Sequence, residues 1–212
     1  MKKLWFLLLV LVVAGSSQAQ NEKYVKAMGT QLVAMSQAGT PAAMQEVVHG
    51  FERIAKAEKN QWLAYYYAGL SQVWHAFLLN DPAQYDALAD KAEAFLEAAE
   101  ALVQGESELA MLAAMVGTLR MAADPMSRFM QYSPRISQYL ELAKQLNPGN
   151  PRPYFWQGQS LLRTPEQFGG GCANARPLLE EALRRFTTFE PATPLHPVWG
   201  KPQTEQLLGS CK

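Results

Sequence analysis

The sequence predicts an all-α protein of about four antiparallel helical hairpins with a proline-rich C-terminal tail, and three observations lead to this prediction. Residues that favour helices dominate, and the alternation of β-branched residues typical of strands is absent. Apolar residues instead recur at intervals of three and four, as in Leu88, Ala92, Phe95, Leu96, Ala99 and Leu102. Helix starts are marked by a capping residue followed by proline, at Thr40-Pro41, Asp81-Pro82, Asp124-Pro125, Ser133-Pro134 and Thr164-Pro165.

The first element along the chain is a signal peptide over residues 1–19. Two lysines precede an apolar run from Leu4 to Val13, and Ala19 ends a short segment that suits cleavage by signal peptidase. The run is too short to cross a bilayer, because a spanning helix requires about 20 apolar residues. No later stretch is long enough either. We therefore expect the mature chain to be exported, to the periplasm or out of the cell, without a membrane span.

The charge of the mature chain argues against two classes of partner. Cleavage after Ala19 removes two of the 19 Lys and Arg residues, which leaves 17 against 19 Asp and Glu residues. A small negative net charge provides no attraction to nucleic acid or to an anionic membrane surface. The remaining length, about 193 residues, suits one domain with a sizeable core.

Repeated spacings organise the helices. Tyr65 and Gly69 follow Ile54 by 11 and 15 residues, Tyr154 and Gly158 follow Ala143 by the same intervals, and the spacing recurs after Ala99. An aromatic residue four positions before a glycine places both on one face of a helix. A triplet of small, large and small residues follows on the next helix, at Ala92, Leu96 and Ala99 and again at Ala175, Leu179 and Ala182.

These motifs resemble the tetratricopeptide repeat (TPR) family. Each unit of that family pairs a first helix, which carries an aromatic and a small residue, with a second helix, which carries the triplet. Leu146-Asn147-Pro148 is similar to the proline that closes a unit in that family. The resemblance implies that the motif residues pack between helices of a superhelical array, with hairpins over residues 22–58, 61–103, 106–146 and 151–187. Three inter-helix segments are longer than the family's, and we expect them at one edge. The last third is also similar to uncharacterised exported repeat proteins of Gram-negative bacteria, a likeness that implies no activity.

We expect the helical array to occupy residues 20–188 and a tail to occupy residues 189–212. The tail begins with FEPATPLHPVWGKP, whose prolines prevent a regular helix, and ends in a short helical segment. Two roles remain open for the tail. It either caps the apolar end of the array, as terminal repeats require, or occupies the concave face in place of a ligand.

The two cysteines are expected to form a disulfide. Cys172 follows three glycines in TPEQFGGGCANA, and Cys211 is the penultimate residue. An even number of cysteines in an exported chain favours the Cys172–Cys211 bond over a nucleophile, which would require a nearby base. The glycines lack the lysine and hydroxyl of a phosphate-binding loop, so they indicate a sharp turn between helices. An anion at the start of the following helix is the less favoured alternative.

No pattern in the sequence indicates catalysis. The histidines, His49, His75 and His196, lie far apart and form no metal-binding motif. No serine or cysteine is accompanied by the partners that would activate it. We therefore predict a protein that is not an enzyme and has no catalytic residue, metal site or cofactor.

Aromatic residues support a binding function. The first helices of the hairpins carry more aromatic side chains than one buried stripe can hold, and Tyr and Trp suit binding surfaces. We expect the concave face to bind a peptide, protein or other partner in the cell envelope, through Tyr66, Tyr67, Phe155, Trp156 and Gln159. The alternative is a small molecule, held in a pocket that the long inter-helix segments close.

Overall fold

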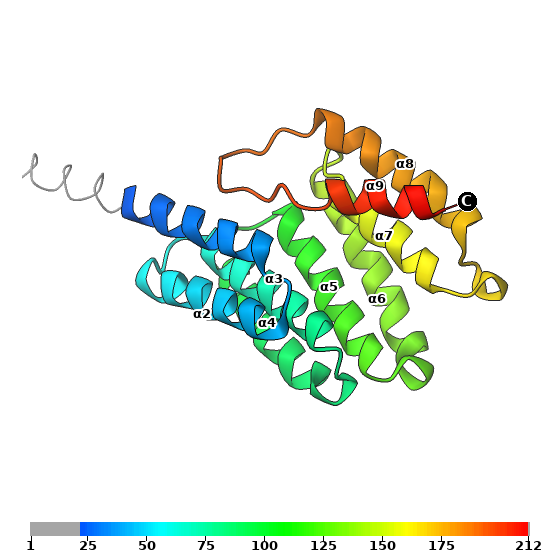
Figure 1. The fold of residues 1–212 in the computed structure, drawn as a ribbon, viewed down its shortest axis with the longest axis horizontal. Coiled ribbons are helices and arrows are strands. Elements are labelled where there is room, and N and C mark those ends of the chain that lie inside the picture. Colours follow the sequence, from blue (N-terminus) through cyan, green and yellow to red (C-terminus); the bar gives the residue numbers. More distant parts are fainter. Residues whose placement is uncertain (1–21, 212) are drawn as a thin grey trace, which may run out of the picture.

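The computed structural model of the chain describes residues 22–211, and within this range it contains helices and no strand (Figure 1). The predicted all-α class is confirmed. A helix over residues 22–37 comes first. It is followed by α2 (Pro41–Ala57), α3 (Trp62–Leu79), α4 (Tyr85–Glu100), α5 (Ser107–Ala123), α6 (Pro125–Leu146), α7 (Arg152–Arg163), α8 (Cys172–Thr188) and α9 (Lys201–Ser210). The signal peptide expected over residues 1–19 lies outside the described residues.

The helices pack mainly against their neighbours in the chain. Extensive contacts join α2 to α3, α3 to α4, α5 to α6 and α7 to α8. Helix α3 also packs against α5, so successive helix pairs lie side by side (Figure 1). Helix pairs therefore occur where the repeat spacing places them. The assignment to a solenoid of the TPR family, and the division into an array and a tail domain, stay predictions.

Three of the predicted capping residues begin helices as expected. The side chain of Thr40 accepts a hydrogen bond from the Ala43 amide at the start of α2, and Asp124 accepts one from the Ser127 amide at the start of α6. Asp81 caps the short 3-10 helix η1 (Pro82–Gln84) in the same way. Each bond satisfies one of the backbone N–H groups that a helix leaves free at its N-terminus.

The prediction of a helix start at Ser133-Pro134 was wrong. Pro134 lies inside α6. A proline within a helix removes one backbone hydrogen bond, whose acceptor would be the carbonyl of Met130. Because Pro134 and Met130 are both exposed, water can bind that carbonyl. The long segment expected between Ala114 and Ile136 is accordingly taken up by extensions of α5 and α6 rather than by a loop.

The glycines of the repeated motif allow the two helices of a pair to approach closely. A Cβ atom at Gly69 would lie 3.2 Å from the carbonyl oxygen of Ala92, and one at Gly158 would lie 2.8 Å from Cγ of Leu179. Ala92 and Leu179 both belong to the buried triplets. The other packing residues of the motif are buried as well, except for Ile54, Tyr65 and Tyr154, which are half-buried.

Substitution of Gly158 by alanine is expected to lower the free energy of unfolding by about 1–2 kcal/mol. Overpacking against the fully buried Leu179 costs about 1–3 kcal/mol, and the better helix propensity of alanine returns up to about 1 kcal/mol. Urea unfolding of the variant measures the difference. Gly29→Ala is the matched control, because an added Cβ at that helical position meets nothing within 4 Å, and it should stabilise slightly. Equal changes in the two variants would show that close packing at Gly158 is unimportant.

The tail folds back over the helices. Residues 189–200, called the strap below, leave α8 as a long loop and return into α9 (Figure 1). Helix α9 begins at Lys201, earlier than predicted, because Pro202 lies in the first turn, where its missing N–H costs no hydrogen bond. The predicted disulfide is confirmed between Cys172 and Cys211, whose Cα atoms are 5.3 Å apart. It ties the start of α8 to the residue after α9.

Candidate ligand-binding cavity

A buried ion pair holds the strap against the helices. The Arg152 side chain is fully buried at the start of α7, and its Nη1 lies 2.8 Å from Oε1 of Glu108 on α5. Its Nη2 donates a hydrogen bond to the backbone carbonyl of Pro197 in the strap. The guanidinium also lies over two strap rings, 4.8 Å from the centroid of Phe189 and 5.3 Å from that of Trp199. Arg152 therefore contacts the strap near both of its ends.

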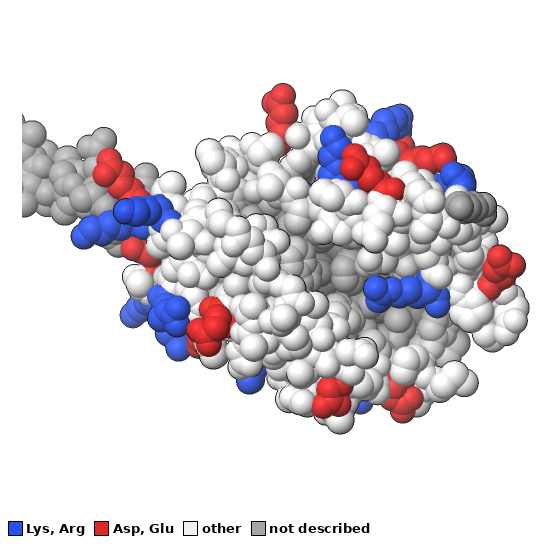
Figure 2. Space-filling view, in the orientation of Figure 1, with Lys and Arg blue, Asp and Glu red and all other residues white. Residues whose placement is uncertain are grey.

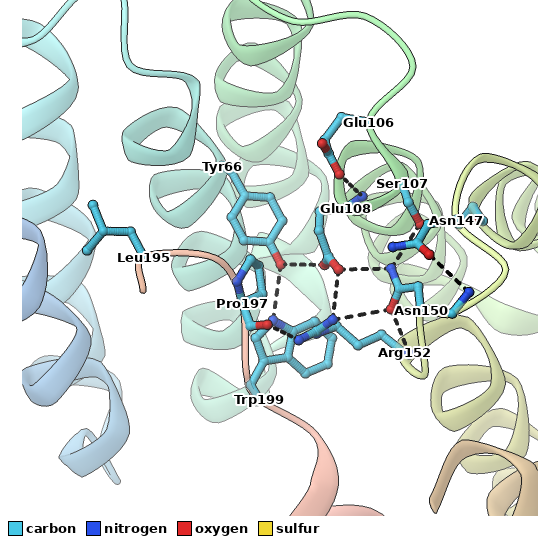
Figure 3. A network of polar contacts seen from close by, with 12 residues as sticks. Tyr66, Glu106, Ser107, Glu108, Asn147, Asn150, Arg152, Leu195, Pro197 and Trp199 are labelled. Atoms are coloured by element: carbon cyan, nitrogen blue, oxygen red, sulfur yellow. Dashed lines mark hydrogen bonds and ion pairs between the residues drawn. The ribbon is translucent and has the colours of Figure 1, made fainter. Parts of the chain in front are cut away.

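The same carboxylate joins three helices and the turn before α7 (Figure 3). Asn150 donates to Oε1 of Glu108 at 2.8 Å, and the Tyr66 hydroxyl on α3 donates to Oε2 at 3.2 Å. The Trp199 indole N–H donates in turn to the Tyr66 hydroxyl at 3.0 Å. Burial raises the pKa of Glu108, and it raises that of Tyr66 well above its ordinary value, although the charge of Arg152 opposes both shifts. The phenol is therefore neutral and acts as a donor.

Local sequence explains how Arg152 reaches this position. In Asn147-Pro148-Gly149-Asn150, the turn after α6, the Asn150 side-chain oxygen accepts hydrogen bonds from the Arg152 amide at 3.0 Å and from its Nη1 at 3.2 Å. Asn150 is itself fully buried. The turn that closes a repeat thus also positions the cation. Sequence reasoning assigned no role to Glu108, Asn150 or Arg152.

The strap forms one wall of a cavity of about 710 Å³. A second wall is the helix over residues 22–37, with Leu32 and Met35, and a third is α3, with Tyr67, Trp74 and Phe77. The strap and the first turn of α9 contribute Pro194, His196, Val198, Trp199, Gly200, Pro202 and Gln203. The Tyr67 hydroxyl donates to the backbone carbonyl of Leu195 at 2.9 Å, which fastens the strap to the opposite wall.

The cavity is apolar and rich in aromatic rings. Trp74 and Trp199 meet nearly at right angles, with ring centroids 5.7 Å apart. The polar side chains along the walls belong to Ser36, Tyr67, His196 and Gln203, and no charged residue is among the described residues that line it. Figure 2 shows the molecule hollowed near its centre, with mostly uncharged side chains around the hollow. Such walls suit an apolar, ring-shaped ligand with a small number of polar groups.

The five residues predicted to bind a partner do not gather in one site. Tyr67 lines the cavity. Tyr66 and Phe155 are buried and contact Trp199 of the strap, which leaves them little free surface. Trp156 is 8% exposed and its indole donates to the Thr118 hydroxyl at 3.1 Å, while Gln159 is half-buried. The structure thus brings only Tyr67 to the cavity wall.

The described part of the chain contains no group of residues suited to bind a metal ion. Between residues 22 and 211, no three His, Cys, Asp or Glu side chains gather closely enough to hold a metal ion. Before α8, Gly169 and Gly171 adopt positive φ, in agreement with the sharp turn that was favoured there over an anion site. None of the described helices is long and apolar enough to cross a membrane.

Comparison with known proteins identifies one relative. No model of a known protein family matches the chain, and no curated protein matches it either. A solved structure, the HusA haemophore from Porphyromonas gingivalis, superimposes with a TM-score of 0.79 at 35% sequence identity. The match covers 89% of this chain and 92% of that protein. The chain therefore belongs to the same protein family as the HusA haemophore.

Proposed function

We propose that this protein is an exported carrier that binds a planar tetrapyrrole of the haem class in the cavity behind the strap. The cavity supports this proposal most directly, because its volume of about 710 Å³ falls in the range of about 300–1,000 Å³ typical of small-molecule sites. The relationship to a haemophore, a protein named for carrying haem, supports the same class of ligand. Of the two partner classes expected from the sequence, the small molecule is therefore preferred.

The walls fit such a ligand. A tetrapyrrole presents two broad apolar faces, and Trp74, Phe77 and Trp199 present aromatic surface to the cavity. The carboxylates at one edge of a haem require hydrogen-bond donors, and His196 and Gln203 are available on the strap side. Stacking against rigid aromatic rings and burial of apolar area together favour binding. A carrier needs no reacting group, in agreement with the prediction that the protein is not an enzyme.

The proposed export agrees with the disulfide. Disulfides persist in oxidising compartments and are rare in the cytosol, and the Cys172–Cys211 bond joins the only two cysteines of the sequence. The signal peptide expected over residues 1–19 would direct the chain to such a compartment.

Titration of the chain from residue 20 onward with haemin and with metal-free protoporphyrin tests the proposal. We expect saturable binding with one site per chain, seen as a shift of the main porphyrin absorbance band and as quenching of tryptophan fluorescence. Absence of saturable binding of either compound would contradict the proposed function.

Charges placed in the cavity should weaken porphyrin binding. Leu78 and Val198 line the cavity but are 38% and 67% exposed, so Leu78→Glu and Val198→Glu should leave the fold intact. Each should weaken porphyrin binding by about 10-fold or more, because an unpaired charge loses its water when the ligand enters. Met126→Glu is the control, since Met126 is 95% exposed and lies outside the cavity. Equal effects of all three changes would place the ligand elsewhere.

The expectation that a peptide or protein of the cell envelope binds the concave face stays a prediction. An exposed apolar cluster on α6, formed by Met126, Phe129 and Met130, offers a separate contact surface. The burial of Tyr66 and Phe155 beneath the strap removes two of the residues on which that prediction depended. Two roles were considered for the tail: capping the array and occupying a binding face. The proposal agrees better with the second role, because it makes the strap part of the ligand site.

A further inference from the structure

We infer that His196 recognises a carboxylate of the ligand, so that the cavity selects ring compounds that carry free carboxylates. This inference rests on the proposed function and names the residue that gives the site its specificity. His196 lies in the strap and lines the cavity. It is the only imidazole among the described residues that do so.

Two contacts fix the orientation of the His196 ring. Its Nδ1 lies 2.7 Å from the hydroxyl oxygen of Thr193, and the ring forms a T-shaped contact with Trp62 at a centroid distance of 5.6 Å. The Thr193 hydroxyl oxygen also accepts a hydrogen bond from the Leu195 amide at 3.3 Å. The hydroxyl keeps its own hydrogen for donation to Nδ1, and when it donates there the ring proton lies on Nε2. In that tautomer the strap presents Nε2–H as a donor.

The donor has no partner within the part of the chain that the structure describes. Across residues 22–211, the Thr193 hydroxyl is the one hydrogen-bond partner of the imidazole, and it binds Nδ1. Burial lowers the pKa of His196 and Arg152 lowers it further, against the opposing charge of Glu106, so the ring is neutral near pH 7. A neutral N–H group can enter an apolar cavity at less cost than a charge. A carboxylate of the ligand would replace water as the acceptor for this N–H group.

The surroundings of His196 also favour a negative group. Gln203 lines the same cavity and carries an amide donor. The first turn of α9 begins beside it at Gly200, without a side-chain cap, and the positive end of the helix dipole favours an anion nearby. These groups add to the effect of the imidazole. A ligand whose carboxylates are esterified offers only a neutral carbonyl oxygen as acceptor, which forms a weaker hydrogen bond than a carboxylate does.

The test compares protoporphyrin, its dimethyl ester and haemin on four proteins. The proteins are the mature chain, His196→Ala, His196→Gln, which keeps an N–H donor near the position of Nε2, and His49→Ala as a control outside the cavity. The mature chain should bind the free acid at least about 10-fold more tightly than the ester, as expected for one hydrogen bond to a charged group. His196→Ala should lose about 10-fold for the free acid and nothing for the ester, whose unchanged affinity also shows that the variant is folded. His196→Gln should recover most of the loss.

Other results overturn the inference in distinguishable ways. An equal loss for acid and ester would show that His196 acts only by apolar packing. A loss restricted to haemin, with a changed absorbance spectrum, would show that Nε2 binds the iron, a role that histidine has in many haem proteins. Both results would leave the proposed function intact. Failure of the mature chain to bind any of the three compounds would instead contradict the proposed function itself.

Discussion

Replacement of Arg152 by methionine is expected to lower the free energy of unfolding by about 3–5 kcal/mol, the usual cost of removing one partner of a buried ion pair. The change leaves Glu108 at 5% side-chain exposure without its counterion. It also removes the donor to the Pro197 carbonyl, so the strap loses a contact near its C-terminal end. Urea unfolding followed by circular dichroism measures the loss. A change below 1 kcal/mol would show that the ion pair does not hold the strap.

Two further variants separate charge from packing. The double variant Glu108→Leu, Arg152→Met should recover much of the loss, because a buried ion pair is often replaceable by apolar residues of similar volume. Arg152 favours this outcome, since its Nε is buried without a hydrogen-bond partner among the described residues. Arg128→Met, which breaks the partly exposed pair with Asp86, should cost at most about 1 kcal/mol.

Loss of the disulfide is the second large effect. Replacing Cys172 and Cys211 together by serine should lower the free energy of unfolding by about 4 kcal/mol, the loop-closure value for a loop of this length, which spans a sequence separation of 39. Helix α9 and the strap should then exchange their amide hydrogens faster than α3 and α5, because the bond ties only the tail to the start of α8.

Unfolding in urea and hydrogen exchange measure these two consequences. The reduced form of the unaltered chain should behave like the double variant, which excludes an effect of the serine side chains. A loss below 1 kcal/mol with unchanged exchange in residues 189–210 would show that the ion pair and the packing of α9 hold the tail without the covalent bond.

Local signals explain what could be predicted from the sequence. The caps at Thr40 and Asp124 act within four residues, and the paired spacing of Gly69 and Gly158 reports close helix packing. The disulfide followed from the compartment and from an even number of cysteines. Pro134 shows where local signals fail, because an exposed proline is tolerated inside a long helix whose other contacts hold it.

The cavity could not be predicted because it depends on contacts between distant segments. Arg152 lies 44 residues from Glu108 and 45 from Pro197, and Tyr67 lies 128 residues from Leu195. Glu108 lies in the first turn of α5, before the apolar run, where an acidic residue is common, so the sequence did not mark it as a buried partner. The aromatic residues of α3 were recognised as a possible binding surface. For the strap that covers part of them, the sequence left two roles open, capping of the array and occupation of the concave face.

Methionine methyl groups provide the most direct test of where the ligand binds. Met35 and Met44 line the cavity, whereas Met126 and Met130 are 95% and 82% exposed on α6. In NMR spectra of the mature chain labelled at its methionine methyl groups, addition of protoporphyrin should shift the Met35 and Met44 signals through the ring current of the bound macrocycle. The signals of Met126 and Met130 should stay in place. Shifts at Met126 and Met130, with Met35 and Met44 unchanged, would contradict a ligand site behind the strap.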